Sequence, residues 1–148
     1  MRRRIVLFVM VSFLFASIGC NTQKKLPKED VNAIILSTMA AQEKAWNEGD
    51  LTKFMEGYWK DEDLSFVGSR LTKGWQTTLD NYKKSYPNKD AMGTLTFDIM
   101  QVKEMTPEVY HVIGKYNLVI GENTPSGMFS LVWKRINGKW LIVADHSS

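Results

Sequence analysis

The last residues of the chain contain side chains that could carry out acid–base chemistry. An apolar segment, KWLIVA (139–144), runs directly into Asp145, His146, Ser147 and Ser148. An imidazole ordinarily titrates near neutral pH, so His146 could accept or donate a proton under physiological conditions. His146 is therefore the candidate catalytic residue, provided that it faces the interior of the protein.

The direction of His146 depends on the turn that precedes it. An Asn-Gly pair at 137–138 is the strongest short-range signal for a type I′ hairpin. A regular hairpin around it places His146 opposite Phe129, on the more apolar face that also holds Trp133, while Asp145 points to the other face. We expect His146 to be buried at the rim of a pocket. A purely structural, hydrogen-bonded histidine is the alternative, and a one-residue slip would exchange the roles of Asp145 and His146.

Other catalytic patterns are missing from the sequence. The chain has two histidines, a single cysteine and no glycine-rich phosphate-binding loop. The acidic run at 61–63 is typical of a solvated loop, although neighbouring carboxylates could bind a cation. We therefore expect neither a metal nor a cofactor.

The elements that position these residues change in character along the chain. Apolar spacing and capping residues predict helices over 31–48, 51–59 and 74–86, with a short strand at Leu64–Val67. After Pro87, segments rich in β-branched and aromatic residues predict long strands over 94–105, 108–120, 128–136 and 139–147. Helices followed by an antiparallel sheet are the order of an α+β fold.

The first 20 residues resemble the signal of a bacterial lipoprotein. Three arginines precede an apolar run, Ile5–Ile18, which is shorter than the roughly 20 residues that a spanning helix needs. We expect residues 1–19 to be a signal peptide and Cys20 to carry a lipid anchor in the cell envelope. Residues 20–30 would then form a polar tether. An ordinary signal peptide is the alternative.

Removal of that signal would leave a neutral chain. The full sequence has 19 basic and 16 acidic residues, and three of the basic ones are Arg2, Arg3 and Arg4. The remaining 16 basic residues balance the 16 acidic ones, since the segment 1–19 contains no acid. A balanced surface without a basic stripe argues against nucleic acid as a partner.

Two motifs at opposite ends of the segment 31–148 carry a family resemblance. The segment AWNEGDLTKFMEGYWKDEDLSFVG (45–68) resembles the junction of the first two helices in SnoaL-like and ketosteroid-isomerase-like proteins. The ending WKRINGKWLIVADHS (133–147) is similar to the final hairpin of their secreted relatives. The chain thus resembles the nuclear transport factor 2-like superfamily. This resemblance implies a cone-shaped fold in which helices and a strongly curved sheet enclose one pocket.

The isomerase mechanism known in that superfamily does not carry over to this chain. It needs a carboxylate base and a tyrosine with a protonated acid as oxyanion donors. In this chain the tyrosine position holds Gln42, and the base position holds Ser65 or Phe66. The position of the protonated acid holds Val132, so none of the three groups is supplied.

Aromatic residues near the implied pocket favour binding of a small, largely apolar ligand. The candidate ligand-binding residues are Tyr58, Trp59, Trp75, Trp133 and His146. Two alternatives stay open. One is an isomerase, hydratase or hydrolase that uses His146 as acid–base. The other is a homodimeric interaction module, whose outer sheet surface we expect to include Val102, Tyr110, Val112 and Val119.

Overall fold

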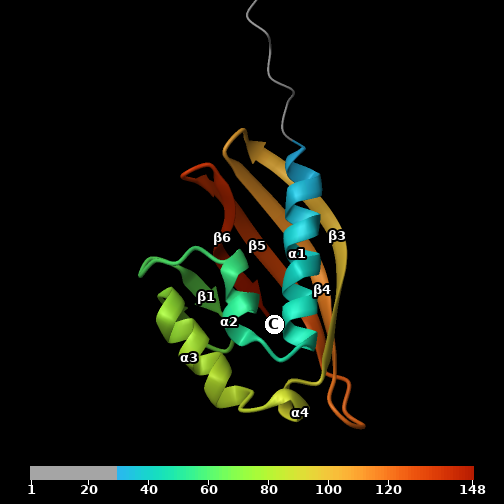
Figure 1. Ribbon diagram of the computed structural model, residues 1–148. Helices are drawn as coiled ribbons and strands as arrows, with labels where there is room; N and C mark the ends of the chain where they lie inside the picture. Colours follow the sequence, from blue (N-terminus) through green and yellow to red (C-terminus); the bar gives the residue numbers. More distant parts are fainter. Residues whose placement is uncertain (1–29) are drawn as a thin grey trace, which may run out of the picture.

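The computed structural model describes residues 30–148, in which helices pack against one side of a curved sheet (Figure 1). The helices are α1 (Val31–Asn47), α2 (Leu51–Phe54), the 3-10 turn η1 (Met55–Gly57), α3 (Trp75–Ser85) and α4 (Lys89–Met92). The strands are β1 (Ser65–Val67), β2 (Leu71–Lys73), β3 (Thr94–Thr106), β4 (Val109–Val119), β5 (Ser126–Ile136) and β6 (Lys139–Ser147). The predicted signal peptide, Cys20 and the tether up to residue 29 lie outside the described residues. Within 30–148, no helix has the length and apolar character needed to cross a membrane.

Aspartate caps begin the first two helices. The Asp30 carboxylate accepts a hydrogen bond from the Ala33 N–H (3.1 Å), and Asp50 accepts one from the Lys53 N–H (2.9 Å). Such caps satisfy backbone donors that the first helical turn leaves free. Gly49 lies between the two helices with a φ of 82°, a conformation that glycine adopts without strain.

The second predicted helix is shorter than the sequence pattern indicates. Instead of a helix over 51–59, α2 gives way to η1, and the chain is already extended at Tyr58. The Trp59 N–H then donates to the Ile142 carbonyl of β6 (2.9 Å). This backbone contact turns the Tyr58 side chain toward the interior, next to the last strand.

The strands form one six-stranded sheet in the order β2-β1-β6-β5-β4-β3. All neighbouring pairs are antiparallel except β1 and β6, which are parallel. The sheet is mixed and does not close into a barrel, because its edges β2 and β3 do not meet. The predicted α+β fold with helices before a curved sheet is confirmed.

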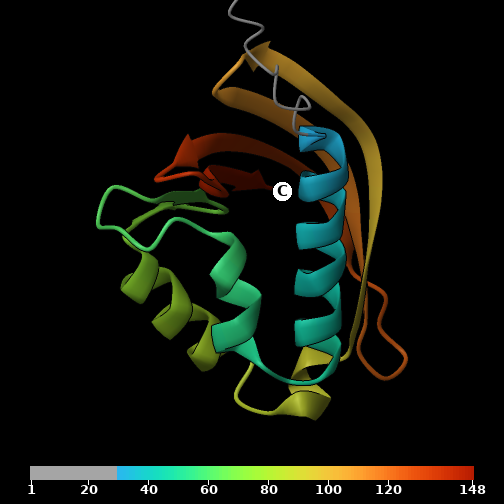
Figure 2. The same ribbon diagram turned by 45° about the horizontal axis from the view of Figure 1, so that its top comes forward.

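The helices lie on the concave side of the sheet (Figure 2). α1 runs along this side next to β3, and hydrogen bonds from its side chains fix the contact. Asn47 pairs with both backbone groups of Leu95 (2.7 and 2.9 Å), and Glu43 accepts from the Phe97 N–H (2.8 Å). The layers thereby enclose an apolar core in which Trp133 and Ile142 are fully buried.

The final hairpin begins as predicted and then departs from a regular pairing. Asn137 and Gly138 both have positive φ values, as a type I′ turn requires, and Trp133 pairs with Ile142. The next pair is Val132 with Ala144, so β6 contains one extra residue at this point. This β-bulge shifts every later residue by one position and therefore exchanges the faces of the strand.

The expected outer surface of the sheet is partly wrong. Tyr110 and Val112 are buried on the concave side, and the Tyr110 ring packs edge-on against Trp140 with 5.1 Å between centroids. Val102 pairs with Val112 and shares its side of the sheet. The convex side of β4, β5 and β6 instead carries the partly buried His111, Ile113, Ser130, Val132 and Ala144.

Close packing at Gly114 gives a test of the curved sheet. A Cβ atom there would lie 2.3 Å from the Phe129 ring and 2.7 Å from the Asp98 carbonyl oxygen. We expect Gly114→Ala to lower the free energy of unfolding by about 1–3 kcal/mol, because the strand backbone cannot move away without breaking ladder bonds. Urea denaturation would measure this loss. The control Gly68→Ala meets only ordinary contacts at 3.6 Å or more and should change stability by less than about 0.5 kcal/mol. Equal effects would contradict the packing argument.

Candidate functional site

A cavity of about 350 Å³ lies between the helices and the concave side of the sheet. Its walls come from α1, α2, α3, the strands β1 to β6 and Tyr58, which follows η1, so the site uses segments from the whole described domain. Most lining side chains are apolar or aromatic, with a few hydroxyl, amide and charged groups among them. This composition is typical of a small-molecule site.

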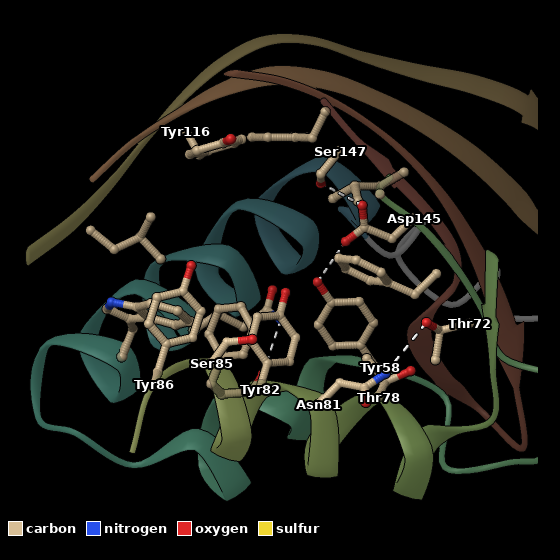
Figure 3. A pocket seen from close by; sticks show the side chains of 18 of the residues that line it. Tyr58, Thr72, Thr78, Asn81, Tyr82, Ser85, Tyr86, Tyr116, Asp145 and Ser147 are labelled. Carbon is tan, nitrogen blue, oxygen red and sulfur yellow. Dashed lines mark hydrogen bonds between the residues drawn. The ribbon is translucent and has the colours of Figure 1, made fainter. Parts of the chain in front are cut away.

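The most polar part of the cavity is built around Asp145 (Figure 3). Its carboxylate accepts one hydrogen bond from the Tyr58 hydroxyl and one from the Ser147 hydroxyl, each at 2.7 Å. Asp145 and Ser147 are two residues apart in β6 and therefore share a face, while Tyr58 approaches from the opposite wall. Asp145 is only 3% exposed, and it is the one charged side chain that is buried among residues 30–148.

Burial dominates the electrostatics of this cluster. It raises the pKa of Asp145 to about 6, although the hydrogen bonds from Ser147 and Tyr58 and the nearby His146 act in the opposite direction. Burial and the adjacent carboxylate also raise the pKa of Tyr58 well above its ordinary value. Tyr58 therefore stays protonated at neutral pH and acts as a donor, while Asp145 changes charge within the physiological range.

Aromatic rings form the wall next to this cluster. Tyr82 and Tyr86 project from α3 and stack with centroids 6.2 Å apart, and Tyr116 lies across the cavity from them (Figure 3). Behind them, the Trp46 ring packs edge-on against Phe54 at 5.2 Å. Buried rings in edge contact hold one another in place, so this wall is preformed.

The rim of the cavity lies at the turn between β1 and β2. Gly68, Ser69 and Arg70 line it here, and Arg70 is exposed. The Asn81 amide donates to the Thr72 hydroxyl at 3.5 Å. This contact joins α3 to β2, next to the turn. A cationic side chain therefore lies at this edge of the cavity.

The expected position of His146 is wrong. The bulge in β6 pairs it with Ser130 rather than Phe129, and its side chain is exposed on the convex side. Asp145 occupies the interior position instead. The exchange of faces that a one-residue slip would cause has therefore occurred, and His146 cannot act on a ligand in the cavity.

The other predicted ligand-binding residues divide into two groups. Tyr58 lines the cavity, as expected. Trp59, Trp75 and Trp133 do not: Trp59 is half-buried, and Trp75 donates its indole N–H to the Met55 carbonyl (2.8 Å) within the core. Trp133 is fully buried in the core of the sheet. These three indoles stabilise the walls rather than contact a ligand.

Sequence reasoning missed most of the polar side chains in the cavity. The regular hairpin pattern places Asp145 on the wrong face, and it does not single out Ser147, or Tyr82, Asn81 and Thr78 within the predicted helix 74–86. The helical spacing of Thr78 and Tyr82, four residues apart, is the signal that could have placed them on one face. The sequence contains no comparable signal for the bulge in β6.

The acidic run at 61–63 remains a loop feature. Asp61 accepts a hydrogen bond from the Asp63 N–H at 3.0 Å, which is a local turn. Between residues 30 and 148, no cluster of histidine, cysteine and acidic residues has an arrangement that could hold a metal ion.

The raised pKa of Asp145 makes stability depend on pH. An aspartate titrates at about 3.9 in an unfolded chain, so protonation favours the folded state, and this contribution disappears as the pH rises through about 6. Relative to Asp145→Asn, the native protein should lose about 2 kcal/mol of unfolding free energy between about pH 4 and pH 8. Urea denaturation at both pH values measures the difference. The exposed control Asp63→Asn should keep a constant difference, and the same constancy for Asp145→Asn would refute the assignment.

Comparison with known proteins identifies the fold family. No protein-family model matches the sequence, and no curated protein has significant similarity to it. Among solved structures, an NTF-2-like protein of unknown function from Shewanella oneidensis is 38% identical, with a TM-score of 0.78. The match covers 80% of this chain and 98% of that protein.

More distant structures share the same fold. A nuclear transport factor 2-like superfamily protein from Salmonella enterica is 18% identical, covers 80% of this chain and 89% of its own, and has a TM-score of 0.62. A ketosteroid isomerase-like protein from Erwinia carotovora is 13% identical at the same TM-score of 0.62, over 81% and 96% of the two chains. The extent and identity of the Shewanella match establish the family: this chain belongs to the nuclear transport factor 2-like (NTF2-like) superfamily.

Proposed function

We propose that this protein binds a small, largely apolar molecule in the cavity of its cone-shaped domain. The observation that carries the proposal is a preformed aromatic cavity with one buried carboxylate in its wall. A cavity of about 350 Å³ is near the lower end of the range for small-molecule sites, which favours a compact ligand. The apolar wall would supply most of the binding energy, and the cluster around Asp145 would orient one polar group.

A second candidate function is acid–base catalysis by Asp145, in place of His146. It is favoured by the carboxyl pKa of about 6, which suits proton transfer at neutral pH, and by the adjacent Tyr58 hydroxyl. Turnover of a bound compound that stops in Asp145→Asn while binding persists would select catalysis over simple binding.

We also propose that the domain is held at the bacterial cell envelope by a lipid on Cys20. Support comes from the charged start, the apolar run and the small residues before Cys20. The neutral charge balance after residue 19 supports a partner other than nucleic acid.

The convex side of the sheet supports a homodimer as a further arrangement. Ile113, Val132 and Ala144 lie there, partly buried and without a covering element among the described residues. Dimerisation of this side would leave the cavity accessible, because the cavity lies on the concave side.

Cavity binding can be tested with N-phenyl-1-naphthylamine, a neutral apolar probe that fluoresces when it leaves water. Leu131 lines the cavity, whereas its neighbour Val132 points to the convex side. We expect Leu131→Trp to weaken probe binding at least about tenfold, because the larger ring fills the space. Val132→Trp is the matched control and should keep native affinity. Circular dichroism would verify that both variants fold. Equal binding by both folded variants would refute the proposed site.

The anchor can be tested by cell fractionation. Cys20→Ser removes the thiol that would be acylated, so we expect the variant to leave the membrane fraction while the native protein stays there. Mass spectrometry of the extracted native protein should show a diacylglyceryl group on Cys20. A Cys20→Ser protein that remains fully membrane-bound would contradict the proposal.

A further inference from the structure

The Asp145 carboxylate has unused hydrogen-bonding capacity that faces the cavity. An ionised carboxylate offers about four acceptor positions on its two oxygens. In this protein Oδ2 accepts from Tyr58 and Oδ1 from Ser147, so about two positions remain. The side chain lines the cavity and points into it from the sheet (Figure 3). The carboxylate therefore keeps hydrogen-bonding capacity for a ligand in the cavity that it lines.

Among residues 30–148, no lysine or arginine forms an ion pair with the Asp145 carboxylate. His146 is the basic residue that lowers the pKa of this carboxyl, and it is exposed on the opposite side of β6. Arg70 is the cationic side chain at the cavity, and it lies exposed at the rim. A buried carboxylate without a paired cation is costly, so a cationic group placed at Asp145 would be strongly favoured.

The titratable groups around this carboxyl are otherwise phenols. Tyr58 directly follows η1, Tyr82 lies in α3 and Tyr86 directly follows it, and Tyr116 lies in β4. Burial and the charge of Asp145 raise the pKa of Tyr82, as they do for Tyr58. Both phenols therefore remain neutral at physiological pH, so neither adds to nor cancels the charge of the carboxylate.

Aromatic faces flank the same position. Phe66 is the β1 neighbour of Asp145 across the parallel pair, and its ring lies 5.8 Å from that of Tyr82. Phe129 pairs with Ser147 on the other side of β6. Rings around a carboxylate stabilise an ammonium group through cation–π attraction while they pack against its apolar substituents.

We infer that the cavity selects amines: the ligand carries an ammonium group that pairs with Asp145 and an aromatic or short aliphatic body that fills the tyrosine- and phenylalanine-lined space. This inference rests on the proposed binding function and specifies the class of ligand. A neutral alcohol could also donate one hydrogen bond to Asp145, but it would leave the buried charge uncompensated. The ammonium ion supplies both the donors and the charge.

A pair of probes of equal shape tests the inference on the intact domain. 1-Naphthylmethylamine is cationic near pH 7.5, whereas 1-naphthalenemethanol has the same ring system and no charge. We expect the native protein to bind the amine at least about tenfold more tightly than the alcohol, measured by calorimetry. Asp145→Asn should abolish this preference, so the amine should lose at least about tenfold more affinity than the alcohol loses.

The pH dependence adds a readout that a merely structural role of Asp145 would not give. The preference for the amine should fall as the pH decreases through about 6, because protonation removes the negative charge. Tyr58→Phe deletes a hydrogen bond that lowers the pKa of Asp145, so the midpoint of this change should move to higher pH. Binding in Tyr58→Phe must still favour the amine above the new midpoint.

The outcomes separate this inference from the binding function itself. If N-phenyl-1-naphthylamine binds but the amine binds no better than the alcohol, the amine selectivity is wrong and the binding function stands. An amine preference that survives in Asp145→Asn likewise overturns the inference. If none of the three compounds binds the native protein, both the inference and the proposed function fail.

Discussion

One extra residue in the last strand determines what the cavity can do. β6 pairs regularly with β5 from the Asn137-Gly138 turn up to Ile142, and the bulge at Val143 then rotates the rest of the strand. Without that residue in the pairing, a histidine would face the helices and a carboxylate would face outward. With the extra residue in β6, Asp145 faces the cavity and accepts a hydrogen bond from the hydroxyl of Tyr58, which follows η1. The chemistry of the interior thus depends on a local irregularity of the backbone.

The buried carboxylate of Asp145 lowers the stability of the folded protein when it is ionised. Its charged form loses hydration that two hydrogen bonds only partly replace, and the raised pKa records this cost. An amide at the same place would avoid the cost of burying a charge and could still accept one of these hydrogen bonds. Groups of this kind are common at functional sites, where a ligand completes an interaction that the empty protein leaves incomplete.

The sequence predicts the fold well because the signals for it are local. The cap at Asp50, the glycine at 49 and the Asn-Gly turn each act within a few residues, and all three are present in the structure. The orientation of Asp145, in contrast, has no local signal in the sequence. It depends on where two long strands lose register, which is set by the curvature of the whole sheet and by the parallel contact with β1. Alternating patterns cannot reveal such a shift, so the candidate site was assigned to the neighbouring residue.

The free edges of the sheet also affect whether molecules at high local concentration can pair strand to strand. β3 is a long edge strand, yet the register breaks at Met100 and Met105 leave these side chains 62% and 56% exposed and interrupt the row of backbone groups. The other end of β3 is bonded by Asn47 and Glu43 of α1, and the opposite edge, β2, is only three residues long. Neither border offers a long, flat template for strand addition. Molecules at high local concentration therefore collide repeatedly without growing into intermolecular sheets.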